Sequence, residues 1–337
     1  MEGTGYVNIY DIAEKANVSI ATVSRVLNNS CAVSDRTREK VLSVIERENY
    51  YPNIFARGLT QNSIHTIGIL YTDASDLFLA SAVYYLEKYF RRWGYNSLLL
   101  CCGYELDQRK AGIELMQLQK VDSIVLAGSH FVEQDDADNA YIREAAQQLP
   151  IGILSGCVKG SNIVCAYCDD KATMLQLSSE LFKRGSQKVI FAYNQKSDSN
   201  RRKISGLEKA YNLRGAEFRP EYAAFLEQTE MEAMEDCIDA LYEKLRFDAV
   251  VCMDDMIAVS VLKYAEKKKL RVPEQLRVVG YNNSVLARCT TPCLSTVDNC
   301  TDELSEKLVK MMVDRIENVK GQTQYVLWGK PVYRETT

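Results

Sequence analysis

The sequence predicts an α/β protein in which a small N-terminal helix-turn-helix domain precedes two lobes, each built on a doubly wound parallel sheet. Three observations lead to this prediction. Residues 8–50 show only helical periodicity, and from residue 64 onward apolar runs typical of strands alternate with amphipathic segments. The chain of 337 residues is also long enough for two or three domains.

The first helix is expected from about Ile9 to Lys15. Asn8 is a suitable N-cap, and Asp11 stands where the acid of a capping box would lie. Asn17 follows where the chain must turn sharply, and asparagine tolerates the left-handed backbone conformation. A second helix can then begin, so that the two form a helix-turn-helix unit.

The second helix, capped by Ser19 and ending at Asn28, divides its residues between packing and an outward face. The outward face suits the major groove of DNA, where arginine reaches guanine or phosphate, hydroxyls reach phosphate, and apolar groups meet thymine methyls. Its members are Ile20, Ala21, Thr22, Ser24, Arg25 and Asn28. The helical pattern alone leaves an ordinary solvated surface helix as the alternative.

A third helix is expected from its N-cap Ser34 to Tyr50. Net charge does not mark this region as a DNA-binding domain, because basic and acidic side chains are equal in number over residues 1–62. The basic ones are Lys15, Arg25, Arg36, Arg38, Lys40, Arg47 and Arg57, and the acidic ones are Glu2, Asp11, Glu14, Asp35, Glu39, Glu46 and Glu48. A search for a basic domain would have missed it.

From residue 64 onward, strands and helices alternate in the manner of parallel sheets. The strand-like runs read TIGILYT, NSLLLCC, SIVLAG, IGILSG, KVIFAY, AVVCM and RVVGY, with helices that end near Trp93, Gln119, Arg184 and Lys269 and one around Gly206. About ten strands are too many for one small sheet, which indicates two subdomains side by side. A ligand would bind in the cleft at the carboxyl ends of the strands.

The eleven cysteines indicate neither a disulfide framework nor a metal site. They are scattered through apolar runs and odd in number, so we expect buried reduced thiols. Cys165 and Cys168 have the spacing of half a zinc site, but no second pair follows, and His65 and His130 lie far away in sequence. We therefore expect no metal and no cofactor.

Catalysis and membrane insertion are not expected either. Asp254 and Asp255 are adjacent, so their side chains diverge and do not suit a paired acid and base. No serine or cysteine has a plausible histidine partner, and RVVGYNN lacks the further glycines of a phosphate-binding loop. No apolar run approaches the roughly 18 to 20 residues that cross a bilayer, and no secretory signal is visible, so a cytoplasmic protein is expected.

Two N-terminal stretches resemble the DNA-binding domain of the lactose-repressor (LacI/GalR) family almost position for position. They read YDIAEKANVSIATVSRVLNN and VSDRTREKVLSVIERENYYPNIFARGL. The resemblance implies a DNA-binding domain over residues 1–62 and removes the solvated-surface reading of the second helix. Besides the outward face, the DNA contacts expected from it are Asn8, Ser19, Ser34, Asn53, Ala56, Arg57 and Leu59.

Residues of about 53–60 match the hinge segment of that family, which implies a helix that forms only on the operator. Two copies would meet in the minor groove, each wedging a leucine, here Leu59, into the central base step. Gly58 agrees with this switch, because a glycine in so short a helix costs about 1 kcal/mol relative to alanine. The resemblance thus implies a homodimer on a pseudo-palindromic operator in double-stranded DNA.

The later part of the chain resembles the effector domain of the family more weakly. The matching segments include IGILYTDASDLFLASAVYYLE, GLEKAYNLRG, FDAVVCMDDMIAVSVLKYAEKKKLRVPEQLRVVGYNNS and TPCLSTVDN. They imply two lobes of the periplasmic-binding-protein type within residues 63–337. The N-lobe would hold about 63–165 and 294–323, and the C-lobe about 166–292 and 324–335.

Motif positions near the strand ends then imply a site for a small polar effector, a sugar or a sugar derivative. The residues are Asp73, Phe78, Ser199, Lys203, Asp254, Asp255 and Asn282. Lys203 stands where members of that family often have arginine. Asn282 stands where they often have aspartate, and Ser155 stands where some have aspartate. Compared with those members, this chain keeps a cation at the site and has fewer carboxylates. This balance would favour an anionic ligand such as a sugar acid or sugar phosphate. The alternative is structural: Asp255 could cap a helix, and Phe78 could belong to the core.

We therefore expect a sequence-specific DNA-binding transcriptional regulator, in the first instance a repressor, controlled by an effector between the lobes. The alternatives are a regulator with a non-sugar ligand and a corepressed or activating protein. A binding protein or an enzyme without DNA function is less favoured, since a free-standing sugar-binding protein would not need residues 7–60.

Overall fold

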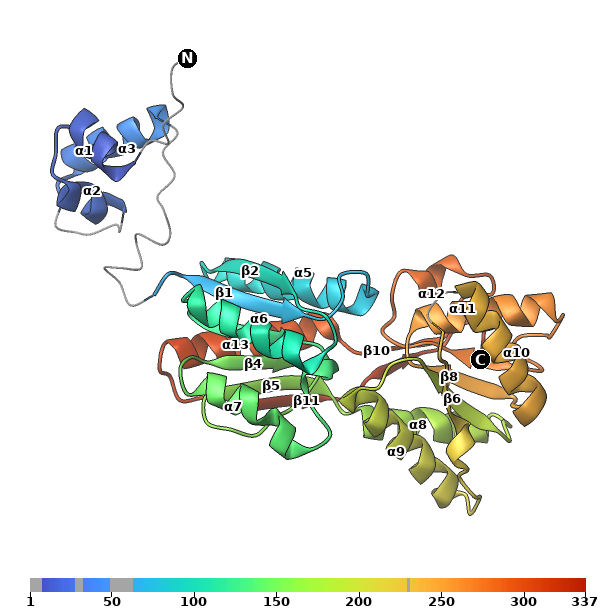
Figure 1. Cartoon of the computed structure of the whole chain (residues 1–337). Helices are drawn as coiled ribbons and strands as arrows, with labels where there is room; N and C mark the ends of the chain where they lie inside the picture. Colours follow the sequence, from blue (N-terminus) through green and yellow to red (C-terminus); the bar gives the residue numbers. More distant parts are fainter. Residues whose placement is uncertain (1–7, 28–32, 49–62, 229–230) are drawn as a thin grey trace. The chain divides into compact units, whose positions relative to one another are not determined.

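The computed structural model describes residues 8–27, 33–48, 63–228 and 231–337. The chain divides into two compact units, residues 1–64 and 65–337, which are treated separately. Figure 1 shows helices in the first unit and parallel sheets covered by helices in the second.

The described part of the first unit consists of α1 (Ile9–Lys15), α2 (Ile20–Leu27) and α3 (Asp35–Arg47). The apolar sides of the three helices form one small core, whose buried members are Ile12, Ala13, Ala16, Val23, Val26, Val41 and Val44. Asn8 caps α1 as the sequence predicts: its side chain accepts from the amides of Tyr10 and Asp11, and its own amide donates to the Asp11 carboxylate. The expected bounds of α1 are confirmed.

The turn between α1 and α2 has the expected backbone. Asn17 has a φ of +47°, and the Val18 amide donates to the Ala13 carbonyl. The Ser19 hydroxyl then accepts from the Thr22 amide at the start of α2, and Ser34 accepts from the Thr37 amide at the start of α3. The helix α3 ends at Arg47, with Glu48 as its C-cap, rather than at Tyr50.

The second unit holds two parallel sheets and one short antiparallel pair. The larger sheet has the strand order β11-β5-β4-β3-β1-β2, and every pairing in it is parallel. Its strands are β1 (Thr66–Tyr71), β2 (Asn96–Cys101), β3 (Ser123–Ala127), β4 (Ile151–Leu154), β5 (Ile163–Cys168) and β11 (Gln324–Leu327). We call this sheet and its helices the first lobe.

Helices cover both faces of the larger sheet. One buried cluster joins the sheet to α5 (Leu77–Arg92) and α13 (Thr301–Ile316), and a second joins its other face to α6 (Leu106–Leu118) and α7 (Ala140–Ala146). Such two-sided burial agrees with the nearly continuous apolar strands β3 and β4, which are buried at every position. The short helices η1 (Ser129–Phe131) and η2 (Asp136–Asn139) follow β3.

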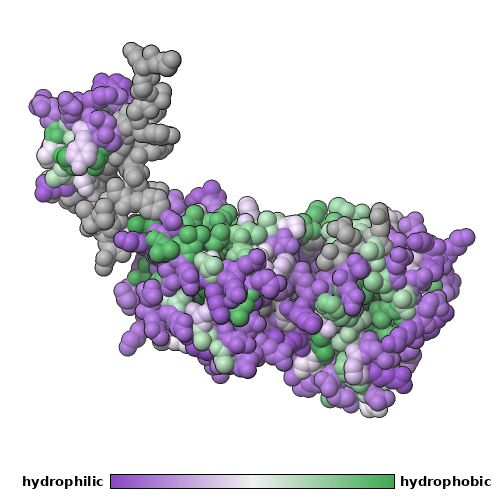
Figure 2. Space-filling view, viewed as in Figure 1, coloured by the Kyte–Doolittle hydropathy of each residue, from purple (hydrophilic) through white to green (hydrophobic). Residues whose placement is uncertain are grey.

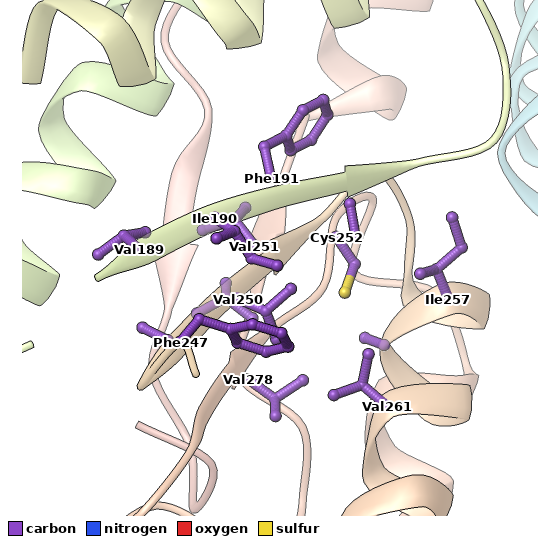
Figure 3. Packing of buried hydrophobic residues seen from close by; sticks show 14 of the residues in the cluster. Val189, Ile190, Phe191, Phe247, Val250, Val251, Cys252, Ile257, Val261 and Val278 are labelled. Carbon is purple, nitrogen blue, oxygen red and sulfur yellow. The ribbon is translucent and has the colours of Figure 1, made fainter. Parts of the chain in front are cut away.

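The second lobe is built on the smaller sheet, whose strand order is β7-β6-β8-β9. Its strands are β6 (Val189–Tyr193), β7 (Ala223–Phe225), β8 (Ala249–Cys252) and β9 (Arg277–Val279), and its helices are α8 (Asp170–Lys183), α9 (Asp198–Leu213), η3 (Pro220–Tyr222), α10 (Met231–Leu245), α11 (Asp255–Lys267) and α12 (Leu286–Cys289). Figure 3 shows Val250 and Val278 from neighbouring strands facing Val261 of α11, while Phe191 points to the other side of the sheet.

The strands also show where the chain passes between the lobes, and they move two expected boundaries. The boundary expected near residue 165 falls inside β5, which continues to Cys168 because Ala166 pairs with Leu154 and Cys168 with Leu327. The C-lobe segment expected at 324–335 begins with β11, which belongs to the first lobe. The passages therefore lie near residues 169, 299–300 and 328–329.

These passages lie beside one another. The strand β10 (Thr296–Asp298) pairs antiparallel with β12 (Lys330–Val332), so that Asp298 lies opposite Lys330. The Asp169 amide donates to the Leu327 carbonyl at 2.8 Å, and the Gly329 amide donates to the Thr173 hydroxyl at 2.9 Å. Within the described ranges, no helix is both long enough and apolar enough to cross a bilayer.

Candidate DNA-reading face and interlobe site

The helix α2 exposes the side that the sequence assigns to DNA. Ile20 is 41% exposed although it is apolar, while Val23 and Val26 on the opposite side are buried. Ala21 and Arg25 are exposed, and Thr22 and Ser24 are half-buried. The helix therefore presents polar and small apolar groups together, the mixture that reads base edges in a major groove.

The remaining DNA-contact residues fall into two groups. Ser19, Asn8 and Ser34 are exposed, and each accepts hydrogen bonds from backbone amides at the start of a helix. They thus have a structural function whether or not they contact DNA. Five expected contacts lie outside the described residues: Asn28, Asn53, Ala56, Arg57 and Leu59.

A small polar cavity of about 60 Å³ lies between the two lobes. Its lining comes from both lobes and from the passages between them. One group consists of Asp76, Phe78, Leu79, Gly128, Ser129, His130, Ser155, Cys168 and Asn299, and the other of Asp170, Gln195, Ser197, Ser199, Asn200, Lys203, Met253, Asp254 and Asn282. An adjoining hollow of about 190 Å³ shares Asp76, Phe78, Gln195, Asp254 and Asn282 with it. We call the two spaces together the interlobe site.

The structure brings most of the sequence-predicted effector residues together. Phe78, Ser199, Lys203, Asp254 and Asn282 all line the cavity. They come from four separate segments, the starts of α5, α9 and α11 and the loop after β9. The carboxyl ends of the parallel strands therefore converge on one polar site, as expected for doubly wound sheets.

Asp73 and Asp255 are placed differently from the expectation. The Asp73 carboxylate accepts from the Ser75 amide and hydroxyl and from the Tyr104 hydroxyl, and it is not among the residues that line the cavity. Asp255 borders only the hollow, and it accepts from the Ser284 amide and the Thr296 hydroxyl at 2.6 Å each. It is therefore tied to the neighbouring loops.

The two aspartates that line the cavity from the starts of α11 and α5, Asp254 and Asp76, are the N-caps of these helices. Asp254, not Asp255, caps α11 by accepting from the Ile257 amide at 2.8 Å. Asp76 caps α5 in the same way, accepting from the amides of Phe78 and Leu79. An N-cap side chain stands at the end of the helix, here the end that faces the cavity. The loop position that sequence reasoning missed was thus Asp76, three residues after Asp73.

Among the residues that the structure describes, Lys203 is the one cation that lines the cavity, and it is buried, with 4% of its surface exposed. Its Nζ lies 3.9 Å from the centre of the Tyr281 ring, and it is attracted by Asp170 and Asp254. Burial lowers the pKa of Lys203 and raises that of Asp170. The lysine charge is thus already compensated inside the protein, which argues against the anionic ligand that the sequence suggested.

A close approach of two helices places Lys203 beside Asp170. A Cβ atom on Gly206 of α9 would lie 2.4 Å from the carbonyl oxygen of Lys171 in α8. Only glycine allows the helices to pack at this distance, and the two helices together supply a group of charges, Asp170 from α8 and Arg202 and Lys203 from α9. Sequence reasoning identified Gly206 as part of a helix, but Asp170 was missed because it belongs to a different helix.

Several side chains join the lobes across the cleft. The Gln195 amide donates to the Tyr104 hydroxyl at 3.2 Å, and Arg202 donates to the Ser155 carbonyl at 3.4 Å. Burial lowers the pKa of His130 to about 4, so that its imidazole is neutral at physiological pH. The site is therefore lined by acids, amides and hydroxyls, which suit reversible binding of a small polar molecule. In the described part of the chain, no three His, Cys, Asp or Glu residues gather as a metal site.

Comparisons with known proteins agree with both units. Residues 8–53 match the model of the lacI family of bacterial regulatory proteins, and residues 179–337 match that of a periplasmic binding protein-like domain. An HTH-type transcriptional regulator of Lachnoclostridium phytofermentans is 36% identical over 331 residues, covering 98% of this chain and 99% of its relative.

Solved structures share the fold. The Lac repressor bound to ONPG in its repressed state covers 99% of this chain and 100% of its own, with a TM-score of 0.84 and 21% identity. The complex of the transcriptional regulator CelR with cellobiose covers 98% and 100%, with a TM-score of 0.71 and 21% identity. The relatives are transcriptional regulators rather than enzymes. The chain therefore belongs to the lacI family of bacterial regulatory proteins and is a DNA-binding transcriptional regulator.

Proposed function

We propose that this regulator is a repressor that binds its operator as a homodimer and is controlled by a small polar effector, a sugar or a sugar derivative, in the interlobe site. The observation that carries the proposal is the polar cavity lined by side chains of both lobes. A ligand that contacts both lobes changes the free energy of one lobe arrangement relative to another. Structural relatives bound to cellobiose and to ONPG support a carbohydrate-like effector.

The DNA contacts are proposed for residues 1–62. The outward face of α2 enters the major groove, where Arg25 reaches guanine or phosphate and Ile20 meets a thymine methyl. Residues 53–60 form the hinge on DNA, with Leu59 as the minor-groove wedge supported by Ala56 and Arg57. Replacement of Leu59 by alanine should weaken operator binding far more than effector binding.

Exposed apolar residues of the first lobe support the homodimer. The strand β2 is at the edge of its sheet, and its Leu98 and Leu99 are 38% and 46% exposed. Tyr84 of the adjacent α5 is 59% exposed, and Figure 2 shows hydrophobic residues gathered over this edge. An apolar edge strand of this kind is normally covered by another chain. A second copy is the occupant that a two-fold operator requires.

Effector control requires a coupling free energy between the two sites, typically about 1 to 3 kcal/mol. The coupling is reciprocal, so a ligand that releases DNA must bind the DNA complex less tightly than the free protein. A ligand with equal affinity for both states would change nothing, however tightly it bound.

The test is a titration of the full-length protein on a labelled operator selected from random DNA. Neutral sugars, amino sugars, sugar acids, sugar phosphates and purines are added in turn, and fluorescence anisotropy follows the DNA. Release by one carbohydrate class supports the proposal. Strengthened DNA binding would instead identify a corepressor, and release only by purines would replace the carbohydrate with another ligand class. Sedimentation of the DNA-free protein checks the homodimer.

A further inference from the structure

The interlobe site has an excess of negative charge. Three carboxylates line its cavity, those of Asp76, Asp170 and Asp254, against one ammonium group, that of Lys203. The neutral His130 does not change this balance. Arg202 lies 3.6 Å from Asp170, and Lys203 attracts both Asp170 and Asp254, so two cations face three carboxylates and the excess negative charge is shared by Asp76 and Asp254.

Asp76 and Asp254 approach the site from different lobes. Both line the cavity and also the adjoining hollow, and their mutual repulsion adds to the burial that raises the pKa of Asp254. Each carboxylate is held in place as a helix cap through its Oδ1 atom. Their Oδ2 atoms accept no hydrogen bond from the residues that the structure describes, so both remain available to a ligand.

A buried amide oxygen adds to the surplus of acceptors. Asn299 is only 8% exposed and lines the cavity, and its Oδ1 has no hydrogen-bond partner among the described residues. Its amide nitrogen is already used, donating to Asn282 Oδ1 at 2.6 Å. The Gln195 nitrogen is used as well, donating to Tyr104, and the Gln195 side chain interacts with the imidazole of His130, whose buried Nε2 has no other partner among the described residues. A buried acceptor without a hydrogen-bond donor lowers the stability of the fold, and a ligand that supplies the donor removes this cost.

We infer that the effector is a cation rich in donors, such as an amino sugar or another polyhydroxylated amine, and that its ammonium group lies between Asp76 and Asp254. The inference rests on the proposed function and names the ligand class of the same site. An ammonium group has three donors and no acceptor, which matches a site that offers acceptors. Its charge also removes the repulsion between the carboxylates, and so favours the arrangement in which the lobes are close.

Other ligand classes fit these groups less well. A sugar acid or a sugar phosphate would bring a further negative charge to two carboxylates that already repel each other. A neutral sugar could donate a hydroxyl hydrogen to Asn299 Oδ1, but it would leave the repulsion between Asp76 and Asp254 in place. A charged donor also forms the stronger hydrogen bond to a carboxylate.

The experiment compares ligands that differ only in an amine. The full-length protein is titrated calorimetrically at pH 7.5 with glucosamine against glucose, and with the dimer of glucosamine against cellobiose. We expect the amine of at least one pair to bind ten times or more tighter than its neutral partner. Release of the labelled operator is measured with the same four compounds.

Two variants locate the ammonium group. Asp76→Asn and Asp254→Asn remove a charge but keep a side chain that can cap a helix. In each variant the ratio of amine affinity to neutral affinity should fall at least tenfold. Asp107→Asn removes an exposed charge from the first turn of α6, and it should leave the ratio unchanged. Thermal unfolding of each variant shows that the second unit is folded.

The outcomes separate this inference from the proposed function. Equal or tighter binding of the neutral partner, with release of the operator, overturns the cationic ligand and leaves the sugar-controlled regulator intact. An amine preference that persists in both aspartate variants overturns the placement of the ammonium group. Failure of all four compounds to bind, with operator binding intact, overturns the inference as well, and the wider titration above then decides the proposed function.

Discussion

The outward face of α2, which we propose reads DNA, and the interlobe site hold their polar groups under opposite conditions. On α2, Arg25 is solvated, and the Ser19 hydroxyl already interacts with that of Thr22 at 2.9 Å. In the interlobe site, Lys203 and Asp170 are buried, and Asn299 Oδ1 has no partner in the described part of the chain. The polar groups of α2 stay hydrated in the absence of DNA, so their exposure costs little free energy. Those of the interlobe site are removed from water even without a ligand, and this desolvation lowers the stability of the fold.

We therefore expect substitutions on α2 to change DNA binding and substitutions in the interlobe site to change the free energy of unfolding. Side chains of the solvated face can be removed with little effect on folding, because water replaces their contacts. Substitution of side chains in the buried interlobe site is expected to change the free energy of unfolding more than substitution on α2 does. Both tryptophans, Trp93 and Trp328, belong to residues 65–337, so their fluorescence reports on the second unit alone.

The largest expected effect is that of Lys203→Met. Loss of the ammonium leaves the buried Asp170 with only Arg202, whose guanidinium lies 3.6 Å away. We expect the free energy of unfolding of the second unit to fall by about 3 kcal/mol. Urea denaturation followed by tryptophan fluorescence measures this. The double variant Lys203→Met, Asp170→Asn should recover much of the loss, and a failure to do so would show that the pair is not what stabilises this region.

Arg25→Ala should change binding without changing stability. Loss of a base contact is expected to weaken specific operator binding by about 2 kcal/mol, while unfolding changes by less than about 0.5 kcal/mol. Anisotropy titrations with operator and with random DNA separate base reading from phosphate contact. If both DNAs lose affinity equally, Arg25 contacts phosphate only.

Asp254→Asn should stabilise the second unit in a pH-dependent manner. Burial raises the pKa of Asp254 from 3.8 to about 6, so the folded chain holds a proton that the unfolded chain releases between these values. Stability from this group is present below about pH 4 and is lost as the pH rises through 6. Asparagine avoids the loss, so we expect a gain of about 1 to 2 kcal/mol at pH 7.5 and little at pH 4. The same gain at both pH values would contradict the charge-based explanation.

The smallest expected effect is that of Ser34→Ala at the start of α3. Loss of the hydroxyl that accepts from the Thr37 amide should cost about 1 kcal/mol of helix stability. Amide hydrogen exchange over residues 33–48 measures it. Ser43→Ala, at an exposed position inside the same helix, is the matched control and should leave protection unchanged or slightly higher. Equal loss in both variants would mean that capping is not the cause.

More of the N-terminal helices than of the second unit could be predicted from the sequence, because the contacts that define these helices are local. The contacts that define α1 and the turn at Asn17 lie within a few residues of one another, so the capping box and the left-handed asparagine were both visible in the sequence. Strands such as β1 and β8 were visible as apolar runs. The helix α13 was not expected, and neither was β11, which takes its place through pairing with the distant β5.

The interlobe site could be predicted only in part, because it is assembled from segments more than 200 residues apart. Motif positions found Phe78, Lys203 and Asp254, which do line the cavity. They did not find Asn299, whose importance comes from burial and from an unused oxygen rather than from its neighbours in sequence. Nor could they show that nearby carboxylates compensate the charge of Lys203, which is one ground for the cationic ligand that we infer.

The three passages between the lobes have a mechanical consequence. The hydrogen bond between residues 169 and 327 and the antiparallel pairing of β10 with β12 hold the three passages side by side. Three connections held side by side restrict the relative motion of the lobes more than a single linker would, and we expect them to favour a change in the angle between the lobes. In the mechanism that we propose, an effector in the interlobe site acts on DNA binding by setting that angle.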